Sequence, residues 1–303
     1  MRQIINYLKL YLSGLNPRLA ASAICLTGLL IFINYYYGLN NRLSVMNDPQ
    51  QMLCWFLVFI FAFGGIYFIS IQFKPASVKL HWKFYTLVVL APAIFAWKIS
   101  AGFSFHFTND HLMNAYWSAV VYWPLKFLVV AVLLFLIWKI LDNGKDYFGL
   151  RARNFNAKPY LFMLAIMIPL IALASTQKDF LSLYPRMQNI SYLESSPNNF
   201  FYRLLYEIAY GIDFISIELF FRGFLIIAFA RYAGTAAILP MAVFYCTIHF
   251  GKPLGECISS FFGGILLGVV TYHTRTIYGG LIIHLGIAWM MEIGGLLGNH
   301  FLK

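Results

Sequence analysis

Long apolar segments separated by short polar loops run along the whole chain. A helix needs roughly 20 apolar residues to cross the hydrocarbon core of a membrane, and most of these segments reach or approach that length. The pattern predicts an all-α fold, a polytopic transmembrane helical bundle of about eight to nine spans. The expected spans are 19–37, 52–73, 84–101, 117–141, 159–175, 200–231, 236–250, 257–273 and 277–297.

The first apolar run resembles a signal peptide, because basic residues precede it. It is too long for the apolar region of a signal peptide, however, and no cleavage site of small residues follows it. Tyr35, Tyr36 and Tyr37 at its end are typical of a membrane interface. We therefore expect 19–37 to be a retained first span.

Composition supports this interpretation. The chain is 61% hydrophobic and 11% charged, whereas soluble domains are about 45–50% apolar and about 25% charged. The net charge of +11 does not indicate a nucleic-acid partner, because the basic residues lie in short loops. There they set the topology and contact anionic lipid headgroups. Four cysteines without Cys-x-x-Cys spacing are expected to be small buried hydrophobic side chains: Cys25, Cys54, Cys246 and Cys257.

Basic and non-basic loops alternate along the chain. The loops 74–83 and 143–158 are rich in Lys and Arg, whereas 102–116 carries only Asp110. By the positive-inside rule the N-terminus lies in the cytoplasm. Nine spans would leave the C-terminus outside, and merging or splitting one run would reverse that. We expect an integral, multi-pass protein of a bacterial inner (cytoplasmic) membrane.

The chain divides into two regions by the position of its polar residues. The region 1–146 is expected to hold about four spans without a polar constellation. The region 147–303 is expected to form a core that carries a polar site, with a fifth span leading in.

The sixth apolar run carries four charged residues, Glu207, Asp213, Glu218 and Arg222. A charge at the bilayer centre costs roughly 2.5–3.5 kcal/mol on insertion scales, so such residues normally face the protein interior and mark a site. Glu218 and Arg222 are four residues apart with the acid first, and we expect them to pair on one helix face. Arg203, one turn away, is the expected partner of Glu207.

Two later apolar runs each contain one deeply placed histidine, His249 and His284. At 1.5 Å per residue, Glu218 and His249 lie about 20 Å from the cytoplasmic ends of their spans, and His284 about 10 Å. We expect the three side chains to line one cavity. The last span places four residues on one stripe at i,i+4 steps: Gly280, His284, Ala288 and Glu292.

General base catalysis on water is the chemistry that such residues offer. A carboxylate in a dry site can accept a proton near neutral pH, and an imidazole can donate to an oxyanion during acyl transfer. Two histidines and a glutamate are also a common set of zinc ligands. No His-x-x-x-His or His-Glu-x-x-His motif occurs, so we expect no metal and no cofactor.

Purely structural roles are the alternative for each of these residues. A Glu–Arg pair inside a membrane can simply lock helices together, which is the role we assign to Arg222. For Glu218, structure and function are equally open. A lone histidine in a span usually donates a hydrogen bond to a neighbouring helix. Only the motif context distinguishes His249 and His284 from such structural histidines.

The segment 147–292 resembles the CPBP family (CAAX protease and bacteriocin-processing, also called Abi), which includes the type 2 CAAX prenyl endopeptidase. The family motif Glu-Glu-x-x-x-Arg corresponds to 217–222, Phe-x-x-x-His to 245–249, and His-x-x-x-Asn to 284–288. The lead-in 147–151 resembles the basic linker that precedes the family core. The resemblance implies an intramembrane peptidase.

Two positions depart from the family motifs. The resemblance assigns water activation to the first glutamate, which is Ile217 here, and an oxyanion contact to the asparagine, which is Ala288 here. Asp213, one turn before Ile217, and Glu292, one turn beyond Ala288, are candidates for a displaced carboxylate. The motif residues that remain are Glu218, His249 and His284 as catalytic residues and Arg222 as a structural ion-pair partner.

Three function classes follow. The first is an intramembrane endopeptidase of CPBP type that cuts a membrane-associated or lipid-modified peptide or protein by glutamate- and histidine-activated water. The second is a non-catalytic relative that acts as a membrane scaffold or immunity protein. The third, a transporter, ranks last because no inverted repeat is evident. The expected partners are membrane lipid and the peptide substrate.

Overall fold

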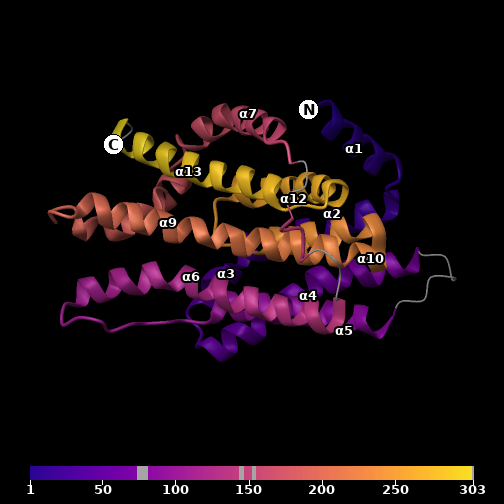
Figure 1. Ribbon diagram of the computed structural model, residues 1–303, viewed down its shortest axis with the longest axis horizontal. Helices are drawn as coiled ribbons and strands as arrows, with labels where there is room; N and C mark the ends of the chain where they lie inside the picture. The colour runs from indigo at the N-terminus through magenta and orange to yellow at the C-terminus, as the bar shows by residue number, and fades with distance from the viewer. Residues whose placement is uncertain (74–80, 143–146, 152–154, 302–303) are drawn as a thin grey trace. The chain divides into compact units, whose positions relative to one another are not determined.

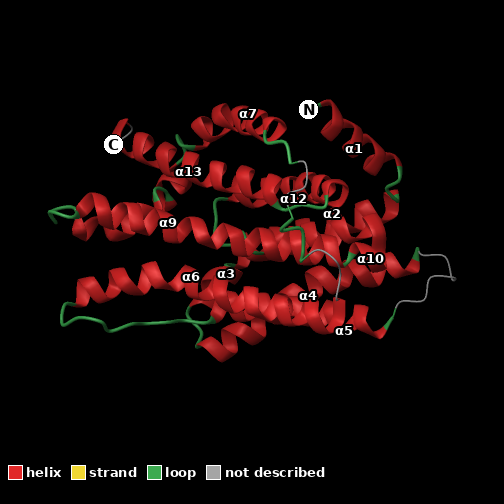
Figure 2. Ribbon diagram, viewed as in Figure 1, coloured by secondary structure: helices red, strands yellow, loops and turns green. Residues whose placement is uncertain are grey.

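The computed structural model describes residues 1–73, 81–142, 147–151 and 155–301. Within these residues every regular element is a helix, which confirms the predicted all-α fold class (Figure 1 and Figure 2). The chain divides into two compact units. Each unit is built from segments that are distant in sequence.

The first unit consists of Met1–Gly102, Leu133–Ala152 and Leu219–Ile277. Its helices are α1 (Arg2–Ser13), α2 (Pro17–Tyr37), α3 (Leu39–Ser44), α4 (Asp48–Gln72), α5 (Trp82–Ser100), the π-helices η1 (Trp138–Asp142) and η3 (Leu219–Ala228), α10 (Ala230–Ala233), the 3₁₀ helix η4 (Gly234–Ala237), α11 (Ile238–Thr247) and α12 (Leu254–Thr274).

Helix α11 is the centre of the first unit. All of its residues are buried, and it packs against α2, α4 and α12. The ring of Phe244 on α11 contacts aromatic rings from three other helices, and such ring pairs are worth about 0.5–1.5 kcal/mol beyond their buried area. These rings belong to Phe59 and Phe63 of α4, Phe95 of α5, and Phe220 and Phe221 of η3.

The second unit consists of Phe103–Val132, Arg153–Glu218 and Tyr278–Lys303. Its helices are most of α6 (His111–Ile137), α7 (Lys158–Ala174), α8 (Lys178–Leu183), the 3₁₀ helix η2 (Arg186–Leu193), α9 (Asn199–Glu218) and α13 (Tyr278–Phe301).

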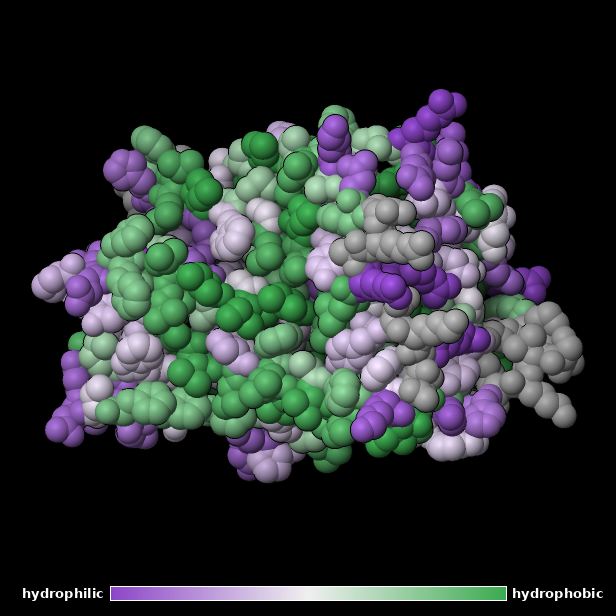
Figure 3. Space-filling model, in the orientation of Figure 1, coloured by the Kyte–Doolittle hydropathy of each residue, from purple (hydrophilic) through white to green (hydrophobic). Residues whose placement is uncertain are grey.

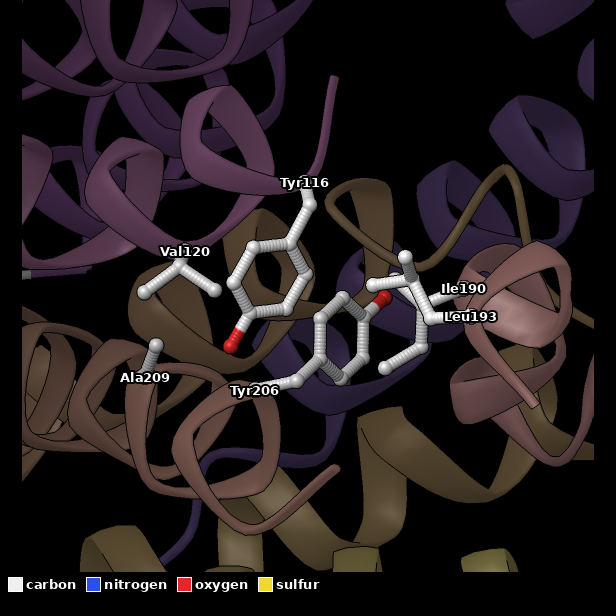
Figure 4. Close-up of a cluster of buried hydrophobic side chains, with 6 residues drawn as sticks. All are labelled: Tyr116, Val120, Ile190, Leu193, Tyr206 and Ala209. Carbon is white, nitrogen blue, oxygen red and sulfur yellow. The ribbon is translucent and has the colours of Figure 1, made fainter. Parts of the chain in front are cut away.

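Close packing of α13 against α7 organises the second unit. A Cβ atom on Gly286 would lie 2.6 Å from Leu164 of α7, and one on Gly279 would collide with Tyr160 of the same helix. Helix α13 also packs against α8 and α9. A buried cluster joins α6, η2 and α9, as Figure 4 shows; it contains Tyr116, Val120, Ile190, Leu193, Tyr206 and Ala209.

The division predicted between 146 and 147 stays a prediction. Each compact unit contains segments from both sides of that boundary, so the two units do not correspond to the two predicted regions. The second unit nevertheless contains 200–218 of the sixth run and all of the last run except Ile277.

Six helices of the described residues are long and apolar enough to cross a membrane: α2, α4, α5, α6 with its π-helical end (His111–Leu141), α12 and α13. Hydrophobic side chains cover much of the face in Figure 3, as expected for helices whose outer surfaces contact lipid. These spans indicate an integral multi-pass membrane protein.

Three of the expected spans are weaker candidates. Helix α7 has 17 residues and α11 has 10, and α9 with η3 carries the charged residues. Eight to nine spans therefore stay a prediction.

Candidate active site

Glu218 and His284 form a buried hydrogen-bonded pair in the second unit. Glu218 is the last residue of α9 and has no exposed surface, whereas the His284 side chain on α13 is 14% exposed. Nδ1 of His284 donates to Oε1 of Glu218 at 3.0 Å. A neutral imidazole that carries its proton on Nδ1 has Nε2 as its basic nitrogen. The pair therefore presents an oriented base backed by a carboxylate.

Gly280 provides the space for this carboxylate. It lies one turn before His284 on α13, and a Cβ atom at this position would lie 2.9 Å from Cδ of Glu218 and collide with Oε2. The i,i+4 stripe of the last span indicated that Gly280 and His284 share a face. It could not indicate that a carboxylate from another helix fills the gap, because spacing along one helix carries no information about its partner.

An apolar cluster adjoins the pair. The ring of Phe214 lies 4.8 Å from the ring of His284, and Phe214 is buried with Tyr210 and Ala288. Ile217 packs against the same cluster. Both positions that depart from the family motifs thus belong to one apolar environment.

His249 lies in the first unit, in the turn that follows α11. Its Nδ1 donates to the carbonyl oxygen of Tyr245 at 2.9 Å, and its ring meets the Tyr245 ring edge-on at 4.7 Å. This contact and the hydrogen bond give the His249 ring a fixed orientation. As in His284, a proton held on Nδ1 makes Nε2 the basic nitrogen of the neutral ring.

Arg222 is fully buried in η3, and the carbon of its guanidinium group lies 4.3 Å from the centre of the Tyr245 ring. A desolvated cation–π contact of this kind is worth about 2 kcal/mol. Arg222, Tyr245 and His249 therefore form one stack. The predicted i,i+4 pairing with Glu218 assumed α-helical geometry, whereas η3 has π-helical geometry. That ion pair stays a prediction.

Glu292 contacts backbone rather than the histidine. Its Oε1 accepts from the N–H of Arg186 at 2.7 Å, and its Oε2 accepts from the N–H of Met187 at 3.2 Å. It lies two turns beyond His284, about 12 Å along the helix. Glu292 thus holds the first turn of η2 against α13, and the structure does not bring it to the Glu218–His284 pair.

Two other acidic residues of α9 lie away from the pair along the helix. Asp213 is half-buried and five residues before Glu218, about 7.5 Å along the axis. The predicted Arg203–Glu207 ion pair is wrong, because Arg203 pairs with Glu194 at 2.8 Å. Glu194 lies just after η2, and a turn between η2 and α9 brings it back to Arg203.

Within the residues that the structure describes, no group of three or more His, Cys, Asp or Glu side chains is placed to hold a metal ion. The absence of a metal stays an expectation from the motif spacing. The second unit holds the acid–imidazole pair, and the first unit holds the oriented imidazole of His249. Both kinds of group suit proton transfer.

A family model described as Type II CAAX prenyl endopeptidase Rce1-like matches residues 199–290. The matched segment includes Glu218, Arg222, His249 and His284 and ends before Glu292. No curated protein matches the chain, and no solved structure does. The match begins with α9 and ends within α13, so it covers every residue of the family motifs. Residues 199–290 therefore form a segment that matches the Type II CAAX prenyl endopeptidase Rce1-like family model, as the motif resemblance predicts.

Proposed function

We propose that the protein is an intramembrane endopeptidase of CPBP type that cuts a prenylated or otherwise membrane-associated peptide or protein. The observation that carries this proposal is the buried hydrogen bond from His284 Nδ1 to Glu218 Oε1, inside the segment that matches the family. The carboxylate holds the imidazole in one orientation and one tautomer, as a general base requires.

The Glu218–His284 pair activates the attacking water. Nε2 of His284 takes a proton from water as the oxygen attacks the scissile carbonyl carbon. Glu218 holds the Nδ1 proton and stabilises the imidazolium that forms, as a carboxylate does behind the histidine of a hydrolytic triad. Proton transfer by a positioned group contributes typically 10²–10⁴-fold to the rate. Phe214 and its apolar neighbours limit water on one side of the imidazole.

His249 is the second candidate for proton transfer. Its Nδ1 proton is committed to the Tyr245 carbonyl, so its protonated form can donate only from Nε2. An Nε2–H group can stabilise the developing oxyanion or deliver a proton to the leaving amine. Water supplies one oxygen of the new carboxylate, and its two protons end on the leaving amine, which is released as an ammonium group. No cofactor is required for this hydrolysis.

A cleavage assay tests the proposal. The purified protein in lipid is incubated with a prenylated CAAX-type peptide and with the same peptide lacking the prenyl group, and products are identified by mass. We expect cleavage by the parent protein and losses of at least about 10²-fold in His284→Ala and His249→Ala. His300→Ala, at an exposed position of the same helix as His284, is the matched control. Cleavage that persists in both histidine variants would reject the site.

The double variant His249→Ala/His284→Ala measures whether the two histidines act in one step. If they do, it should lose little more than either single variant, because residues that act in one step are not additive. Multiplication of the two losses would instead indicate separate actions.

A non-catalytic relative that binds such peptides is the second candidate. The specific observation in its favour is that Ile217 and Ala288, where the family motifs carry Glu and Asn, lie in one apolar cluster. This candidate predicts binding of the prenylated peptide without product formation, and an unchanged affinity in His249→Ala.

We also propose about eight to nine spans with the N-terminus in the cytoplasm of a bacterial cell. Labelling of single introduced cysteines from each side of the membrane tests this topology. Positions in 38–51 and in the loop after α12 are the most informative, because the count of spans decides the side of the second loop.

A further inference from the structure

His249 lies outside the regular helix that precedes it. Helix α11 ends at Thr247, and the chain turns through 248–252 before α12 begins at Leu254. The turn is closed by short-range backbone hydrogen bonds, from His249 N–H to the Cys246 carbonyl and from Lys252 N–H to the His249 carbonyl. Backbone outside a helix has fewer bonds to fix it, so such turns open locally more easily.

Helix α2, more than 200 residues earlier in the sequence, holds this turn in place through side-chain hydrogen bonds. Nδ2 of Asn34 donates to the carbonyl oxygen of Phe250 at 2.9 Å, directly after His249. Oδ1 of the same amide accepts from the N–H of Asn40 at 3.0 Å. Asn34 is 4% exposed and lies within a candidate span. Its side chain thus uses both ends of the amide to join three segments.

Tyr35 adds a second bond to the same turn. Its hydroxyl donates to the carbonyl oxygen of Lys252 at 2.7 Å. Two consecutive residues of α2 therefore bind two carbonyls of the turn, one on each side of Gly251. A Cβ atom on Gly251 would lie 3.3 Å from the Asn40 amide, so the glycine lets the turn approach this closely.

We infer that Asn34 and Tyr35 are positioning residues that fix the turn carrying His249. A polar amide inside a span is costly unless it bonds to a neighbouring helix or segment, and here the bond is made to the turn with the candidate catalytic residue. Active-site geometry must be held within about 0.5 Å by such supporting bonds. The N-terminal spans, which lack a polar constellation of their own, thereby contribute to the site.

Hydrogen–deuterium exchange of the full protein in lipid nanodiscs tests the fixation without any need for activity. We expect Asn34→Leu to raise exchange in peptides that cover 248–252 by about threefold to thirtyfold, the effect of losing interhelical hydrogen bonds of ordinary strength. Tyr35→Phe, which removes only the hydroxyl, should raise it less. Two variants are matched controls: Thr27→Val, because Thr27 is a buried polar residue of α2 whose hydroxyl bonds within its own helix, and Tyr36→Phe, because Tyr36 is 70% exposed.

The catalytic part of this inference rests on the proposed role of His249. In an active protein, Asn34→Leu and Tyr35→Phe should lower kcat while KM stays within about twofold, because a displacement of 1 Å at a reacting group can cost about 10² in rate. Loss of all folded protein in Asn34→Leu leaves Tyr35→Phe as the deciding variant.

Exchange and kcat that match those of Thr27→Val and Tyr36→Phe would overturn the inference. Faster exchange with unchanged kcat would also overturn the positioning role. If the parent protein cuts no substrate, the proposed function fails, and the exchange measurement still decides whether Asn34 and Tyr35 fix the turn.

Discussion

Ile217 packs against the apolar cluster in which Ala288 is buried beside Tyr210 and Phe214. Ile217 comes from α9 and Ala288 from α13, so the two departures from the family motifs share one apolar cluster although they are distant in sequence. A polar group at either position alone would face apolar neighbours. Each of the two apolar residues therefore suits the cluster that it packs in.

The first prediction follows from this shared cluster. Ile217→Glu alone should lower stability by at least about 2 kcal/mol, because it places an ionisable group in an apolar cluster. Adding Ala288→Asn should restore part of that loss, with a coupling of about 0.5–3 kcal/mol between contacting positions. Thermal unfolding of the parent, both single variants and the double variant measures this coupling. Strict additivity would show that the two side chains do not interact.

The second prediction concerns the carboxylate. Glu218→Gln keeps the size of the side chain and an oxygen that accepts from His284 Nδ1, but it removes the charge behind the imidazole. We expect kcat to fall by at least about 10²-fold with little change in stability. Asp213→Asn should keep most of the activity, since Asp213 lies about 7.5 Å away along α9. The opposite pattern of losses would assign the base to Asp213.

The sequence predicts the helical fold because span length and apolar composition are properties of continuous segments. The six candidate spans all correspond to expected runs. The short helix α11 shows where that approach fails. Its apolar run is 236–250, yet only Ile238–Thr247 is α-helical. Its ends are set by η4 and by the turn that Asn34 binds, and both depend on tertiary contacts.

The site is predictable to a similar degree. Buried polar residues within apolar runs identified Glu218 and His284, and the structure joins them. The space at Gly280, the backbone partners of Glu292 and the π-helical geometry of η3 could not be predicted, because each depends on a neighbouring segment. The Arg203–Glu207 prediction failed for the same reason, since Glu194 reaches Arg203 through a turn.

The third prediction concerns the stack of Arg222 on Tyr245. Arg222→Ala should lower stability by at least about 2 kcal/mol, the value of a desolvated cation–π contact. The stability of Arg222→Lys should lie between that of the parent protein and that of Arg222→Ala, because lysine keeps the charge but lacks the planar group that stacks on a ring. Arg231→Ala, at an exposed position, is the control. If Arg222→Ala unfolds at the same temperature as the parent protein but has no activity, the assignment of a structural role to Arg222 is wrong.

The fourth prediction separates Glu292 from the chemistry. Glu292→Ala leaves the N–H groups of Arg186 and Met187 without their acceptor, and each buried unsatisfied donor costs about 1–3 kcal/mol. Glu292→Gln should cost less, because its amide oxygen can still accept one of the two bonds. We expect lower thermal stability and unchanged turnover per folded molecule. A stable variant without turnover would make Glu292 the displaced carboxylate.

The last prediction tests the space that Gly280 leaves for Glu218. In an exposed helix, Gly→Ala stabilises by about 1 kcal/mol, because alanine is the better helix former. At Gly280 the added methyl group would collide with Glu218 Oε2, and the carboxylate is buried at the end of α9 with no exposed surface to move into. Overpacking of this kind costs typically 1–3 kcal/mol and outweighs the gain in helix propensity. The displaced carboxylate would also lose its geometry with His284 Nδ1, so kcat should fall by about 10²-fold. Gly263→Ala in α12 is the matched control, because nothing lies within 4 Å of the added atom, and it should be neutral or slightly stabilising. Equal stability and equal turnover in the two variants would show that Gly280 is not needed to seat the carboxylate.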